Sequence, residues 1–295
     1  MLVVNLPQNF QMNAVSKFTS QIVGFSGEPL DDVVVFDFEK LNFIDGNGYT
    51  VLSNSIGWLA SKGVEVRFRR FNHPNNHAVQ YLDDCGFFLK YAKCQVRSSA
   101  KVRDTTVPCI HIQQQQSFSW VERRLSPWLE WTLGVGYGQV ASIRTCVKEV
   151  LNNIADHSKV STGFVHAQHY PNTKNIKIIT SDFGEGIPNT IRNRYGPMSD
   201  FEAILHATKN GVTAQSQPNN MGAGLSYLVD TVLANGGVVR LHSLTGNLTC
   251  RCDNRGRMQQ HRGRGSGLYP GTLIEIELDT RLFVGDDDDR ADFEW

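Results

Sequence analysis

The stretch KEVLNNIADHS, Lys148–Ser158, decides how the chain is interpreted. It belongs to a segment, 140–157, whose apolar residues recur at the spacing of an amphipathic helix: Val147, Val150, Leu151 and Ile154. Residues four positions apart share a helix face, so a second, polar strip is expected, made of Glu149, Asn153, Asp156 and His157. An exposed face would favour longer side chains, whereas short carboxylates and amides suit a magnesium ion that also holds phosphate oxygens. This segment alone does not decide whether the polar strip faces solvent or a bound ligand.

Length and composition set the wider limits. A chain of 295 residues favours two domains, and its 29 basic and 29 acidic residues balance. A neutral total disfavours nucleic-acid coating, which needs a basic surface. No run approaches the roughly 18 apolar residues of a membrane span. The start, MLVVNLPQNF, lacks the pattern of a signal peptide, so a cytoplasmic protein without a membrane segment is expected.

The first part of the sequence, 1–94, alternates strand and helix patterns and predicts an α/β domain. Its expected strands are 2–5, 33–38 and 65–70, and its expected helices are 12–22, 49–60 and 77–82. The polar segment 95–116 is expected to be a connector that holds one candidate strand, 107–112.

A second α/β domain is expected over 117–281. The expected helices are 120–133 (interrupted by Pro127), 140–157, 198–208 and 225–234, and the expected strands are 163–169, 176–181, 238–243 and 272–278. The segment 251–264 is read as a loop carrying five arginines, and the acidic end, 282–295, as disordered.

Two glycine motifs accompany the polar helix. The first, Asp182-Phe-Gly184-Glu-Gly186-Ile187, follows a strand, where its glycines permit a close backbone approach by a ligand. The second, Gly222-Ala-Gly224-Leu225, opens a helix, whose free N–H groups suit phosphate. Each motif alone is weak. A dinucleotide-binding Rossmann fingerprint is disfavoured because neither the preceding strand nor the third glycine is present.

The order of these motifs is specific: the helix with E-x-x-x-N, then D-x-G-x-G-I, then G-x-G-L, then Gly271-Thr272. Over roughly residues 115–280 the chain resembles the Bergerat-fold ATPases, the superfamily of DNA gyrase and the histidine kinases. The resemblance implies an α/β two-layer sandwich that binds ATP and magnesium.

The resemblance also implies roles for single residues. Glu149 would polarise the attacking group, Asn153 would coordinate magnesium, and Asp182 would bind the adenine amino group with help from Thr272. The segment 189–221 would correspond to the lid over ATP. The implied ATP-binding residues are Asn153, Asp156, Asp182, Gly184, Gly186, Ile187, Lys209, Thr213, Gly222, Gly224, Leu225 and Thr272.

Within that superfamily the small domain and the N-x-x-x-H ending at His157 resemble the anti-sigma-factor serine kinases. The N-terminal part is similar to STAS domains, the antagonists of such kinases. Its loop reads Asp45-Gly46-Asn47-Gly48. Asn47 stands where those antagonists carry the phosphorylated serine, and an amide has no hydroxyl to phosphorylate. A docking surface or a helix N-cap are the other roles expected for this loop.

Three functions remain open at this stage. The first is a serine/threonine kinase or partner-switching ATPase, with Glu149 as base and a STAS-type antagonist or sigma-like regulator as protein partner. The second is an ATP-gated interaction module with little catalysis, in which the STAS-like part docks or inhibits. The third, nucleic-acid binding through the arginines of 251–264, is disfavoured by the neutral total charge. A homodimer is left open.

Overall fold

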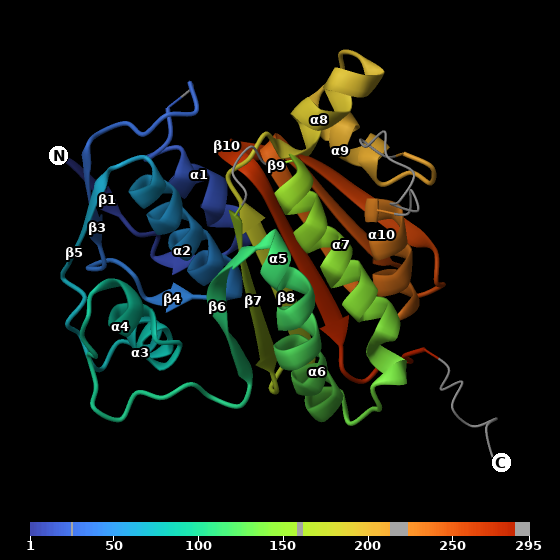
Figure 1. Cartoon of the computed structure of the whole chain (residues 1–295), viewed down its shortest axis with the longest axis horizontal. Coiled ribbons are helices and arrows are strands. Elements are labelled where there is room, and N and C mark those ends of the chain that lie inside the picture. Colours follow the sequence, from blue (N-terminus) through green and yellow to red (C-terminus); the bar gives the residue numbers. More distant parts are fainter. Residues whose placement is uncertain (25, 158–161, 213–223, 287–295) are drawn as a thin grey trace.

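The computed structural model describes residues 1–24, 26–157, 162–212 and 224–286, which form two α/β units (Figure 1). In the N-terminal unit, the described strands β1, β3 and β5 form a parallel sheet in the order β1-β3-β5. Its elements are β1 Leu2–Asn5, β2 Asn9–Phe10, α1 Val15–Thr19, β3 Val33–Asp37, β4 Phe43–Ile44, α2 Gly46–Ser61, β5 Glu65–Arg69, α3 His77–Asp84 and α4 Phe87–Tyr91. The three strands predicted for this unit are confirmed.

The second unit contains an antiparallel sheet whose described strands follow the order β6-β7-β8-β10-β9. The strands are β6 Thr106–Gln113, β7 Thr162–Tyr170, β8 Asn175–Asp182, β9 Val238–Cys252 and β10 Met258–Asp279. The helices are α5 Gln114–Trp120, α6 Ser126–Leu133, α7 Ala141–His157, α8 Gly186–Tyr195, α9 Asp200–Ala207 and α10 Gly224–Ala234, with a π-helical turn, Val121–Leu125, before α6. Figure 1 shows α5, α6, α7 and α10 on one side of this sheet, with the N-terminal unit beside it.

The two faces of this sheet are covered by different parts of the chain. Side chains alternate along a strand, so neighbouring residues of β8 point to opposite faces. Ile178 joins the core that α7 and α10 build, whereas Ile179 joins the core built by the N-terminal unit. The same alternation puts Asp182 on the α7 face and Ser181 on the face toward α2.

Helix α2 is buried on almost every side because it lies between its own unit and the second sheet. Glycine makes this close packing possible. A Cβ on Gly57 would lie 2.7 Å from Cζ of Phe164 in β7, and one on Gly46 would lie 2.8 Å from Cδ1 of Ile179 in β8. Both contacts are too short for any other residue without movement, so α2 is shaped to fit this sheet.

Several expectations need correction. The strand expected at 107–112 is confirmed as β6, but because it spans 106–113 and pairs with β7 it belongs to the second sheet and not to a connector. Residues 186–195, expected as a loop, form α8; Pro188 lies in its first turn, where proline costs no helical hydrogen bond. The expected arginine loop is mostly a hairpin, because β9 and β10 extend through it to Cys252 and from Met258.

The acidic end was expected to be disordered from 282, and this is wrong for 282–286. The Oδ1 of Asn235 accepts hydrogen bonds from the backbone N–H groups of Val284 at 3.2 Å and Gly285 at 2.9 Å. Asp286 Oδ2 accepts from the N–H of Ser142, at 2.6 Å, in the first turn of α7. A carboxylate at a helix N-terminus binds free N–H groups and complements the helix dipole, which orders the first part of the acidic run.

Candidate functional site

Asp182 ends strand β8 with its carboxyl group almost fully buried. Its Oδ1 accepts a hydrogen bond from the backbone N–H of Gly184 at 2.8 Å. Burial raises the pKa of Asp182 to about 7, although backbone N–H groups of Gly184 and Thr272 stabilise the charged form. An ionised carboxyl group has about four acceptor positions, so these donors leave capacity for an amine from a ligand. Such a buried carboxylate is a natural partner for an exocyclic amine.

The backbone around Asp182 is tightly packed, which explains the glycines. Gly271 has φ +85°, and a Cβ there would lie 2.7 Å from Oδ1 of Asp182. Gly186 has φ +77°, and its Cβ would lie 2.7 Å from Oγ of Ser243. Both positions therefore require glycine for conformation and for space.

Ser243, on β9, is a site residue that the sequence analysis missed. Its Oγ donates to the carbonyl of Gly271 at 2.5 Å and accepts from the N–H of Ile187 at 3.0 Å. It also lies 3.5 Å from Oγ1 of Thr272, its cross-strand partner. One hydroxyl group thus ties together the two turns beside Asp182. The only signal in the sequence is a small polar residue at a strand position that shares its face with Leu241.

Helix α7 passes close to the same end of the sheet. Ile154 packs over Gly163 near the start of β7, where an added Cβ would lie 2.9 Å from the Cγ2 of Ile154. Gly163 neighbours Phe164, which pairs with Ser181, so it lies beside the end of β8. Asn153 precedes Ile154 on the helix. Asn153 and Asp182 therefore lie toward the same end and the same face of the sheet.

Glu149 and Asn153 lie on the α10 side of α7. Cys146 of α7 contacts Thr231 of α10 through its thiol. At 100° a residue, Glu149 and Asn153 fall within about 60° of Cys146 around the helix. Both are half-buried, and neither has a side-chain hydrogen bond or ion pair to another described residue. The strip thus faces the space where α10 runs past α7.

Helix α10 runs antiparallel to α7. Its C-terminal neighbour Asn235 binds residues 284–285, and Asp286 binds the first turn of α7, so these two ends meet. The N-terminus of α10, at Gly224, consequently lies toward the C-terminal half of α7, which holds Glu149 and Asn153. Free N–H groups of a helix N-terminus attract anions.

The remaining predicted residues divide into three groups. Ile187 and Leu225 are half-buried and pack together with α8 and α9. Lys209 is exposed in the turn after α9, and the structure does not bring it to Asp182 through any contact. Thr213 and Gly222 lie outside the described residues, as do the side chains of Asp156 and His157.

The donor groups of the described side chains limit which metal ion this site could hold. Among the described side chains, no group of three or more His, Cys, Asp or Glu residues could hold a metal ion. Magnesium bound to a nucleotide needs only one or two protein oxygens, since phosphate and water supply the rest. The amide oxygen of Asn153 and the carboxylate of Glu149 fit that smaller requirement.

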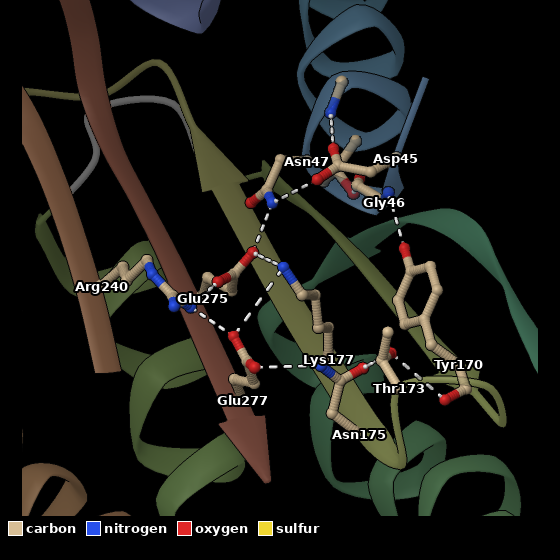
Figure 2. A network of polar contacts seen from close by, with 12 residues as sticks. Asp45, Gly46, Asn47, Tyr170, Thr173, Asn175, Lys177, Arg240, Glu275 and Glu277 are labelled. Carbon is tan, nitrogen blue, oxygen red and sulfur yellow. Dashed lines mark hydrogen bonds and ion pairs between the residues drawn. The ribbon is translucent and has the colours of Figure 1, made fainter. Parts of the chain in front are cut away.

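The opposite face of the sheet carries a polar network instead (Figure 2). Glu275, on β10, is 1% exposed and pairs with Lys177 at 3.1 Å and with Arg240. Burial acts to raise the pKa of Glu275, but the two cations and Asn47 outweigh it and hold the pKa below its ordinary value. Glu277 extends the network by pairing with Arg240 at 2.5 Å.

Asn47 links the N-terminal unit to this network. Its Nδ2 donates to Glu275 and, at 3.3 Å, to Oδ2 of Asp45 (Figure 2). The Oδ1 of Asp45 accepts from the N–H of Gly48 at 3.1 Å and caps α2. The N-cap predicted for this loop is therefore confirmed, and Asn47 also contacts the second sheet within the chain. The loop's role as a docking surface stays a prediction.

Comparison with known proteins adds no relative. No protein-family model matches the chain, and no curated protein matches it. None of the helices in the described ranges has the length and apolarity to cross a membrane.

Proposed function

We propose that the second unit binds ATP with magnesium, as Bergerat-fold ATPases do, on the face of its sheet that carries Asp182. The observation that carries this proposal is the buried Asp182 carboxyl group beside Gly271 and Gly184. It offers hydrogen-bond acceptors in a setting where only glycine fits around it. An adenine amino group is the donor that this arrangement suits.

Other residues would bind the magnesium ion and the phosphate groups, which the contact between Asp182 and adenine does not reach. Asn153 would hold magnesium, which neutralises the charge of the phosphate groups during their transfer. The N-terminus of α10 would bind phosphate oxygens through its backbone N–H groups. Glu149, one helical turn from Asn153, would accept a proton from an attacking hydroxyl group or water. Phosphoryl transfer depends mostly on positioning and charge neutralisation, and these groups provide both.

The favoured activity is a regulatory serine/threonine kinase or ATPase of the anti-sigma-factor type in the cytoplasm. Its phosphoacceptor would be a separate STAS-like protein, since Asn47 of this chain has no hydroxyl group. The second candidate is an ATP-gated interaction module. It is favoured by the direct packing of the STAS-like unit on the sheet of the nucleotide-binding unit.

Glu149→Gln separates the two candidates. This variant keeps the size and the hydrogen-bonding capacity of the side chain but cannot act as a base. For a kinase or ATPase we expect phosphoryl transfer and hydrolysis to fall about 100-fold or more, within the range of general-base effects, with nucleotide affinity changed less than threefold. Thr145→Ala, an exposed position on the same helix, is the control. Equal slow turnover in the wild type and Glu149→Gln supports the interaction module.

A further inference from the structure

The N-terminal unit contacts the residues on both sides of Asp182 in the sequence. Asn54 of α2 donates its Nδ2 to Oγ of Ser181 at 2.7 Å. Trp58, one turn further along α2, packs edge-on against Phe183, with ring centroids 5.6 Å apart. All four side chains are buried. Because side chains alternate along a strand, residues 181 and 183 face α2 while Asp182 between them faces α7.

The same helix also reaches the second strand of the site. The hydroxyl group of Ser181 lies 2.6 Å from that of Tyr269 on β10, and Phe183 packs edge-on against the Tyr269 ring. The pairing of β10 with β9 changes register between Tyr269 and Thr272, which marks an irregularity just before the site. Such irregularities aim side chains near binding sites and need neighbours to hold them. Tyr269 is fully buried, so it is well suited to this anchoring.

The end of helix α1 binds the part of β10 that directly precedes Tyr269. Thr19 Oγ1 donates to the carbonyl of Leu268 at 2.6 Å, and the N–H of Leu268 donates to Oγ of Ser20 at 2.9 Å. A Cβ on Gly267 would lie 2.6 Å from that same Oγ, so the two units are in tight contact here. The strand that carries Asp182, β8, and its neighbour β10 are thus both contacted by the N-terminal unit.

We infer that Asn54 and Trp58 are positioning residues for the nucleotide site, and that the N-terminal unit controls that site through them. This inference rests on the proposed function for its ligand, but its geometry is independent of the ligand. A shift of α2 moves Ser181 and Phe183 together, and Asp182 moves with them. By thermodynamic reciprocity, nucleotide binding strengthens the docking of the N-terminal unit by the same factor by which docking strengthens nucleotide binding.

Asn54→Leu tests the inference, because leucine has the same number and branching of side-chain heavy atoms as asparagine but cannot form the hydrogen bond. Ala60→Leu is the control, because it introduces leucine at an exposed position of the same helix. Amide hydrogen exchange over 181–187 and 268–273 is measured first, without nucleotide. We expect at least a tenfold faster exchange of these segments in Asn54→Leu and less than a threefold change in Ala60→Leu. Trp58→Phe gives a milder second variant should Asn54→Leu fold poorly.

Affinity for a non-hydrolysable ATP analogue with magnesium is measured on the same proteins. We expect about tenfold weaker binding for Asn54→Leu than for Ala60→Leu. Unchanged exchange over 181–187 in Asn54→Leu and Trp58→Phe, or an equal increase in Ala60→Leu, overturns the positioning role. If exchange changes as expected but the wild type binds no adenine nucleotide, the positioning role stands and the proposed function fails.

Discussion

The two faces of the β6-β7-β8-β10-β9 sheet differ in how their polar groups are used. On the α2 face, Glu275 is matched by Lys177, Arg240 and Asn47, so its charge is compensated within the protein. On the α7 face, Asp182 is also buried but has no cation beside it among the residues that the structure describes, and burial raises its pKa to about 7. A buried carboxyl group without a counter-charge costs stability, and such groups concentrate at functional sites. The difference separates a face whose buried carboxylate is paired within the chain from the face on which we propose that the nucleotide binds.

The largest effect expected from this contrast is a pH dependence of stability. The folded-state pKa of Asp182 is raised, so its contribution is fully present below about pH 4 and is lost as the pH rises through about 7. The free energy of unfolding of the wild type, relative to Asp182→Asn, should fall by roughly 4 kcal/mol across that window. Denaturant unfolding of both proteins at several pH values measures this. A difference that stays constant with pH would contradict the uncompensated charge.

A smaller effect is expected from adding a charge on the α2 face. Asn47→Asp puts a carboxylate between Asp45 and Glu275, where a donor now stands. Loss of the hydrogen bonds and the new repulsion should destabilise the protein by roughly 3 kcal/mol at pH 7. Asn47→Ala removes the donor without the charge, and its cost should be about half as large. If the two variants unfold at the same denaturant concentration, a negative charge at position 47 is not repelled measurably by Glu275.

The fit of α2 to the sheet gives the next effect in size. Gly57→Leu forces a side chain against Phe164, and overpacking of this kind costs about 1–3 kcal/mol. Ala60→Leu adds a comparable side chain at an exposed position of the same helix and should change stability by less than about 0.5 kcal/mol. Thermal or denaturant unfolding distinguishes them. Equal stability of the two variants would show that α2 does not need its glycine at 57 for docking.

The sequence predicted the elements with strong periodicity, and it failed where tertiary contacts decide. The α7 stripe and the three N-terminal strands follow from their apolar spacing. Helix α2 was expected over 49–60 and is confirmed, but its glycines weaken a helix locally, and its burial on almost every side is explained only by the second sheet. Helix α8 was missed because its local propensity is poor and its packing on α9 compensates.

The candidate site was predictable only in part. The sequence alone identifies Asp182, Gly184 and Gly186, because a predicted strand is followed there by glycines at a regular spacing. Ser243 and Asn54 could not, since each acts across the sheet on residues more than 50 positions away. No spacing in a single sequence records such a contact. The alternation of faces along β8 does predict that residues 181 and 183 point away from Asp182, but not what meets them there.

The most direct test of the central claim compares two purine bases that differ at one position. At pH 8, above its pKa of about 7, Asp182 would be ionised and would accept a hydrogen bond from the amino group of ATP, whereas inosine triphosphate offers a carbonyl oxygen there and should bind at least tenfold more weakly. In Asp182→Asn the single amide oxygen is occupied by backbone N–H groups, so its NH₂ group faces the ligand. Calorimetric titration should therefore show the preference reversed in the variant. The same ratio of affinities in both proteins, or no binding of either nucleotide to the wild type, would contradict the account.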